Sequence, residues 1–282
     1  MRTGTLLGLS ASGFHRMHYY DWGEPSNPRV VICVHGLTRN GRDFDFLAKS
    51  LCGEFRVVCP DIVGRGRSDW LESKAGYAYP QYMADLNALI ARVSDVPQTE
   101  LYWVGTSMGG LIGMLMAALP RTPIRKLVLN DAGMTVPKSA LERLAAYVGK
   151  VARFPSLDAL ERHVRDVSAP FGALTDEQWS HLTVHGARQH PDGSWEHRYD
   201  PAIGAAFEGE LKDIDLTAYW DAVRCPTLLL RGVHSDVLLK ETAEEMTQRG
   251  PKAELVEFEE VGHAPMLMCE EQVSAVREFL LR

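Results

Sequence analysis

The sequence predicts an α/β protein with a mostly parallel, eight-stranded sheet, helices on both faces of the sheet and one helical insertion. Two observations predict the sheet: short runs of Val, Ile and Leu recur along the chain and end in polar loops, and stretches with helical spacing separate them. Strands that are buried on both faces read as such short apolar runs. A third observation, one long break in the alternation, predicts the insertion.

Six apolar runs are the expected strands of the sheet interior. They cover residues 30–34, 55–59, 101–104, 126–129, 227–230 and 254–258. Residues 5–22 have the pattern of an antiparallel hairpin and are expected at the edge of the sheet. Helices are expected over 79–93, where apolar residues recur at helical spacing, and also over 240–248 and 270–281.

The alternation of strands and helices stops between about residues 135 and 217. This stretch has helical patterns over 139–151, 156–167 and 175–184 but no strand-like run. We therefore expect an α/β core formed by residues 1–134 and 219–282, with residues 135–218 inserted as a helical lid.

Composition and charge narrow the class of protein. Hydrophobic residues make up 45% of the chain and charged residues 24%, which is typical of a globular domain. The net charge is −7 and no basic stripe is present, so nucleic acid is not an expected partner. No apolar run is long enough to span a membrane. Neither a signal peptide nor a CxxC pair is found, so we expect a cytoplasmic protein with reduced cysteines.

The motif Gly105-Thr106-Ser107-Met108-Gly109 carries the clearest functional signal. It matches G-x-S-x-G and lies between a strand-like and a helix-like run, which is the context of a nucleophile elbow. The turn lifts the serine hydroxyl above the end of the sheet, and glycine two residues before and after it relieves the crowding. Ser107 is therefore the expected nucleophile.

A serine hydroxyl needs a base, and the base needs a carboxylate that fixes its tautomer. His263 follows the last strand, so it should lie at the same sheet edge as Ser107. Two carboxylates follow strands in the required chain order: Asp236 and Asp131. We favour Asp236, because its spacing to His263 accommodates one helix and one strand, and keep Asp131 as the alternative.

The chain resembles the α/β-hydrolase superfamily, in particular its lid-bearing esterases, C–C bond hydrolases and haloperoxidase-like enzymes. The resemblance rests on His35-Gly36, the turn at 61–68, the elbow and the Asp236 and His263 loops, in that order. It implies an oxyanion hole formed by the backbone amides of Met108 and Leu37, with His35 in a structural role. It also implies that residues 61–68 form a structural turn.

Several residues are weaker candidates for substrate binding. Arg39 or Arg65 could bind an anionic group, although solvated loop arginines are the simpler interpretation. Four aromatic residues of the insertion could line an acyl pocket or form its core: Trp179, Trp195, Tyr199 and Phe207.

Together these features predict a serine hydrolase that cleaves a small to medium carboxylic ester, or a lactone or thioester, through an acyl-enzyme. No metal or organic cofactor is expected, since no Cys/His cluster has zinc spacing. A C–C bond hydrolase, a perhydrolase or an acyltransferase could use the same triad, and a ligand receptor on this fold is the non-enzymatic alternative.

Overall fold

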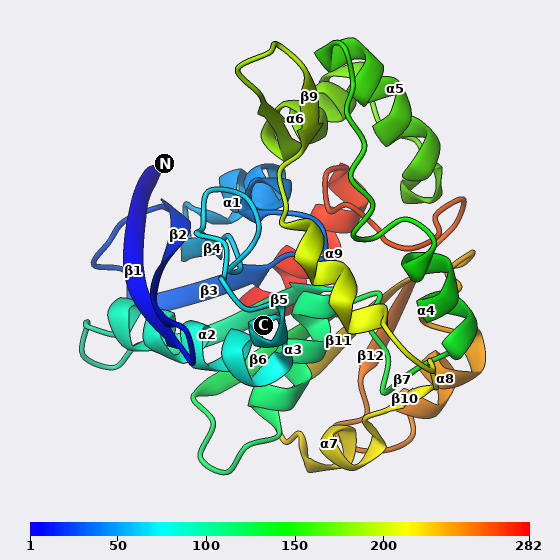
Figure 1. Cartoon of the computed structure of the whole chain (residues 1–282). Coiled ribbons are helices and arrows are strands. Elements are labelled where there is room, and N and C mark those ends of the chain that lie inside the picture. Colours follow the sequence, from blue (N-terminus) through cyan, green and yellow to red (C-terminus); the bar gives the residue numbers. More distant parts are fainter.

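The computed structural model describes residues 1–282 and centres on one eight-stranded sheet, as predicted (Figure 1). Its order is β1-β2-β4-β3-β5-β6-β11-β12. The strands β1 and β2 form an antiparallel hairpin at the edge of the sheet, and β2 also pairs antiparallel with β4. Every other pairing is parallel. The strands are β1 Arg2–Ser10, β2 Gly13–Trp22, β3 Arg29–Val34, β4 Arg56–Pro60, β5 Glu100–Thr106, β6 Ile124–Asn130, β11 Thr227–Gly232 and β12 Glu254–Phe258.

Helices cover both faces of this sheet, which explains the continuous apolar runs. Along β3, Val31 and Cys33 pack into one core with α1 and α9, while Val30 and Ile32 pack into the opposite core with α2, α3, α7 and α8. The helices are α1 Asp45–Leu51, α2 Tyr79–Val93, α3 Met108–Ala117, α7 Thr217–Ala222, α8 Lys240–Met246 and α9 Glu270–Leu281. None of them has the length and apolar character needed to cross a lipid bilayer.

The long segment between β6 and α7 holds three helices and also short strands that the sequence pattern did not indicate. Its elements are β7 Thr135–Val136, α4 Lys138–Ala145, α5 Leu157–Val167, α6 Asp176–Gly186, β8 Ala187–Gln189, β9 Trp195–His197 and β10 Ile214–Asp215, with 3-10 turns η3 Ala169–Phe171 and η4 Pro201–Phe207. Thr175 and Gln178 form a capping box at the start of α6. The β7–β10 pair joins the end of the segment to its beginning, and α5 and α6 stand beyond the sheet (Figure 1).

Candidate active site

Ser107 occupies a tight turn between β5 and α3, at φ 51° and ψ −117°. A side chain other than glycine in this region of φ is strained. The flanking glycines make the turn possible: a Cβ at Gly105 would lie 2.2 Å from the carbonyl oxygen of Gly109, and one at Gly109 would lie 2.0 Å from that of Val34. The turn therefore has the geometry of a nucleophile elbow, and it presents the Ser107 hydroxyl at the end of the sheet.

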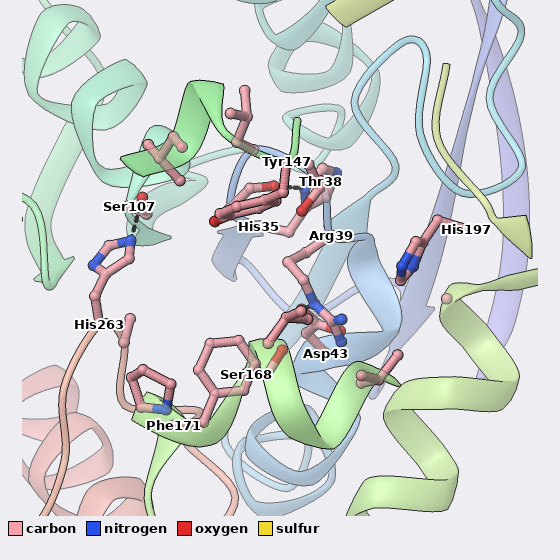
Figure 2. A pocket seen from close by; sticks show the side chains of 18 of the residues that line it. His35, Thr38, Arg39, Asp43, Ser107, Tyr147, Ser168, Phe171, His197 and His263 are labelled. Atoms are coloured by element: carbon pink, nitrogen blue, oxygen red, sulfur yellow. Dashed lines mark hydrogen bonds and ion pairs between the residues drawn. The ribbon is translucent and has the colours of Figure 1, made fainter. Parts of the chain in front are cut away.

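His263 lies beside Ser107, in the loop between β12 and α9. Its Nε2 is 2.9 Å from Ser107 Oγ, a hydrogen bond drawn in Figure 2. Its Nδ1 is 2.6 Å from Oδ2 of Asp131, whose side chain is fully buried. Since the carboxylate can only accept, Nδ1 carries the proton and Nε2 is free to accept one from Ser107.

The carboxylate beside His263 is Asp131, so the preference for Asp236 in the sequence analysis was wrong. Asp236 instead accepts hydrogen bonds from Arg143 of α4, at 2.5 and 2.9 Å, and its side chain is 49% exposed. The strands β6 and β11 are parallel neighbours, so the loops after both reach the same sheet edge. Asp131 directly follows β6, whereas Asp236 lies four residues beyond the end of β11.

The loop after β11 does contribute to the site, through Ser235. Its hydroxyl donates to Asp131 Oδ2 at 2.5 Å, and the amide of Gly232 donates to Asp131 Oδ1 at 3.1 Å. Asn130 connects the end of β6 to the residue before Ser107 and to the loop of His263. Its Nδ2 donates to Thr106 Oγ1 at 3.0 Å and to the carbonyl of Pro265 at 2.7 Å. The sequence analysis missed both residues. Their only signal was a polar side chain at or just after a strand end, which many loop residues share.

The loop after β3 is held in place by His35. The amide of Ile62 donates to His35 Nε2 at 2.9 Å, so the proton is on Nδ1, which donates to the Gly36 carbonyl at 2.7 Å. Burial lowers the pKa of His35 to about 3, so the ring is neutral at pH 7. Beyond it, the amide of Leu37 makes no backbone hydrogen bond, and Met108 begins α3, where amides lack intrahelical partners.

Arg65 also contacts this loop, and it is fully buried rather than solvated. Its Nε donates to the Leu37 carbonyl at 2.8 Å and its Nη1 donates to Tyr82 Oη at 3.0 Å. Its Nη2 lies 3.7 Å from Met108 Sδ. The interpretation of Arg65 as a solvated loop residue was wrong, and it is too deeply enclosed to reach a substrate.

Two cavities meet at Ser107. One, of about 300 Å³, is lined by both polar and apolar residues and is called the polar chamber here; the other, of about 520 Å³, is mainly aliphatic and is called the apolar chamber. Both volumes fall within the range typical of ligand pockets. The polar chamber includes Thr38, Arg39, Asp43, His163, His197 and His263. The apolar chamber includes Met108, Leu111, Val136, Leu141, Ile203 and Phe207.

The structure separates the four aromatic candidates of the inserted segment. Tyr199 lines the polar chamber and Phe207 the apolar chamber. Trp179 and Trp195 line neither: Trp179 stacks on Phe171 with ring centroids 6.4 Å apart, and both tryptophans pack in the small core of the segment. Of the expected substrate-binding residues, Arg39, Tyr199 and Phe207 therefore face the site.

The fold and the site define a hydrolase, and comparison with known proteins agrees. The profile of the Alpha/beta hydrolase family matches residues 31–276, so the chain belongs to this family. The 3-hydroxybutyrate-oligomer hydrolase of Cupriavidus necator is 45% identical over an alignment of 287 positions, which covers 99% of this chain and 97% of that protein.

Two further relatives agree with this assignment. An esterase of Mycobacterium tuberculosis is 29% identical over 236 residues, covering 81% of this chain and 73% of that protein. An α/β hydrolase from Novosphingobium aromaticivorans has a similar structure, with a TM-score of 0.87 at 35% identity, covering 99% of this chain and 98% of that one. The chain is accordingly a carboxylic ester hydrolase.

Proposed function

We propose that the protein is a serine hydrolase whose triad is Ser107, His263 and Asp131, and that it cleaves oligomeric esters of short hydroxy acids. The observation that carries the triad is the continuous hydrogen-bonded chain from Ser107 Oγ through the imidazole to the buried carboxylate. The substrate class is supported by the likeness to the Cupriavidus necator 3-hydroxybutyrate-oligomer hydrolase along nearly the whole of both chains.

In this mechanism the Ser107 oxygen attacks the ester carbonyl carbon while His263 Nε2 takes the hydroxyl proton. Asp131 keeps the imidazole in the required tautomer and stabilises the imidazolium that forms. The amides of Leu37 and Met108 donate to the negative oxygen of the tetrahedral intermediate. His263 returns its proton to the departing alkoxide, and water then releases the acid from the acyl-enzyme with the same base.

The experiment that tests the nucleophile is labelling with a fluorophosphonate probe followed by peptide mass spectrometry. We expect the adduct on Ser107, and we expect Ser107→Ala to lower kcat on a p-nitrophenyl butyrate substrate by about 10⁴-fold or more. An adduct on a different residue, or full activity of Ser107→Ala, would reject the proposal.

The acid of the triad has a matched pair of variants. Asp131→Asn should lower kcat by roughly 10⁴-fold, because the amide favours the wrong histidine tautomer. Asp236→Asn, which loses only a solvent-exposed ion pair with Arg143, should change kcat by less than about threefold. Equal losses in the two variants would contradict the assignment of Asp131.

A further inference from the structure

The nucleophile stands at the junction of two chambers with different chemistry. Ser107 and Leu37 line both chambers, so the reacting ester carbonyl would lie at their meeting point. Of the residues that line the apolar chamber, 17 of 23 are hydrophobic, against 12 of 28 in the polar chamber. The two halves of an ester bound at Ser107 would therefore enter different surroundings.

The position of His263 decides which half of the ester enters which chamber. His263 lines the polar chamber and not the apolar one. Because this residue must hand its proton to the oxygen of the leaving group, the leaving group lies on the same side of Ser107 as the imidazole. The leaving alcohol is thus assigned to the polar chamber and the acyl group to the apolar chamber.

Arg39 lines the polar chamber together with Ser107. A Cβ at Gly36 would lie 3.7 Å from Arg39 Cγ and 3.8 Å from Ser107 Cβ, so both side chains border Gly36. Figure 2 shows Arg39 between the Ser107–His263 pair and His197. Its side chain is 17% exposed, so the guanidinium is largely removed from solvent but still reachable from the chamber.

Asp43 fixes the orientation of this guanidinium. Arg39 Nε and Nη2 each donate to Asp43 at 2.8 Å, one to each carboxylate oxygen. A guanidinium has five N–H groups, so three remain: the two on Nη1 and one on Nη2. Two parallel N–H groups in a fixed plane match the geometry of a second carboxylate.

The charge of the polar chamber favours an anion. Three cationic side chains line it (Arg39, Arg143 and Lys150), and Asp43 is the one carboxylate among its lining residues. The rings of His163 and His197 add polar surface; they lie 5.6 Å apart and make no hydrogen bond to another residue. Asp43 and Asp236 offset the charges of Arg39 and Arg143, so the excess positive charge comes from Lys150, and Arg39 offers its remaining N–H groups to a carboxylate on the leaving group.

We propose that the polar chamber binds the carboxylate-terminal unit of a hydroxy-acid oligomer, with Arg39 as its carboxylate-binding residue, so that cleavage proceeds from that end. This inference rests on the proposed function and names the end of the substrate that is recognised. When Ser107 attacks, its oxygen bonds to the carbonyl carbon and the bond from that carbon to the alkoxide oxygen breaks. The departing unit then carries a new hydroxyl, protonated by His263, and its original carboxylate unchanged.

The test compares the linear trimer of 3-hydroxybutyrate as the free acid with the same trimer capped as its primary amide, measuring released products by chromatography. We expect the wild-type kcat/KM to be about 10- to 100-fold higher for the acid, the range given by a charge-assisted hydrogen bond. In Arg39→Gln this ratio should fall towards one. Arg39→Gln/Asp43→Asn should behave in the same way, without leaving the Asp43 carboxylate buried and unpaired.

Arg42→Gln is the matched control. Arg42 pairs with Asp45, and its side chain is 16% exposed. Because Arg42 lines neither chamber, the variant measures the effect of losing a similar ion pair without a change in the site. Its acid-to-amide ratio should equal that of the wild type. A wild-type ratio near one, or a preserved ratio in both Arg39 variants, would overturn the inference while the proposed function stands. If neither trimer is cleaved although p-nitrophenyl butyrate is, the substrate class itself is wrong and the inference fails with it.

Discussion

At the scale of single residues, Arg65 differs from the other buried arginines in what surrounds its charge. Arg56 and Arg231 each contact a carboxylate, whereas Arg65 contacts only carbonyl, hydroxyl and thioether groups and the faces of tyrosine rings. A buried charge without a counter-ion is costly unless it is well solvated by such groups. The charge lies directly behind Leu37 and Met108, where the proposed oxyanion would form.

We therefore expect Arg65 to act as a positioning residue for the proposed oxyanion hole. Arg65→Met should lower kcat by roughly tenfold or more, less than the 10²–10³ lost when a direct donor is removed, with little change in KM. Arg65→Lys should recover part of the loss. The measurement that separates this role from simple destabilisation is the affinity for an alkyl boronic acid, a tetrahedral mimic, which should weaken in parallel with kcat.

Arg56→Met serves as the control for loss of a buried arginine, because Arg56 is on β4 and pairs with Asp21 away from the site. It should reduce stability and leave boronic acid affinity at the wild-type value. If Arg65→Met binds the boronic acid as tightly as the wild type does, the positioning role is wrong.

At the scale of elements, the elbow depends on glycine where β5, α3 and the end of β3 meet. A Cβ at Gly109 would lie 2.0 Å from the Val34 carbonyl oxygen and 2.5 Å from its carbon, and neither backbone atom can move without shifting β3. Because β3 leads into the loop of Leu37, such a shift would also disturb the proposed oxyanion hole.

Gly109→Ala should consequently lower the free energy of unfolding by about 1–3 kcal/mol or more, the usual cost of overpacking. We also expect its kcat to fall, since the Leu37 loop moves with β3. Gly53→Ala is the control: a Cβ there meets no atom within 4 Å, so its urea denaturation midpoint should remain within experimental error of the wild type. A Gly109→Ala protein as stable as Gly53→Ala would show that the contact can relax.

The elements also show which parts of the site were predictable. The elbow and the His263 loop were found because each combines a local motif with a preceding strand, and both are fixed by short-range geometry. The choice between Asp131 and Asp236 could not be made from the sequence, because β6 and β11 are adjacent and the loops after both strands reach the same edge of the sheet. The same holds for Trp179 and Trp195 of the inserted segment, because spacing predicts that a residue is buried but not which surface covers it.

At the scale of the whole molecule, the eight-stranded sheet and its two layers of helices follow from the alternating pattern. The pairs β7–β10 and β8–β9 could not be predicted, because strands of two or three residues carry no periodicity. The two chambers were also beyond sequence reasoning. They depend on where the inserted segment packs over the sheet edge, which is set by long-range contacts rather than by local spacing.

The whole molecule also carries several histidines that are neutral in the folded state. Burial is the main cause: it lowers the pKa of His35 to about 3 and the pKa values of His18, His185 and His197 to about 4. In the unfolded chain each has a pKa near 6.5. Because the folded pKa is the lower one, their contribution to stability is present above pH 6.5 and is lost as pH falls through 4.

Asp61 acts in the opposite direction. Burial raises its pKa from 3.8 to about 6, so its contribution to stability is complete below pH 3.8 and is lost as pH rises through 6. Burial also raises the pKa of Asp85, so between pH 6 and 4 these two carboxyl groups offset at most two of the four protons taken up by the unfolded histidines. We therefore expect the free energy of unfolding, measured by urea denaturation, to fall steadily from pH 7 to pH 5.

His185→Gln should reduce the slope of this fall by up to one proton, because the variant no longer has that histidine to protonate in the unfolded state. The half-buried position of His185, on α6 and outside both chambers, keeps the variant away from the proposed chemistry. A free energy of unfolding that stays constant or rises between pH 7 and pH 5 would show that these rings take up protons while the protein remains folded.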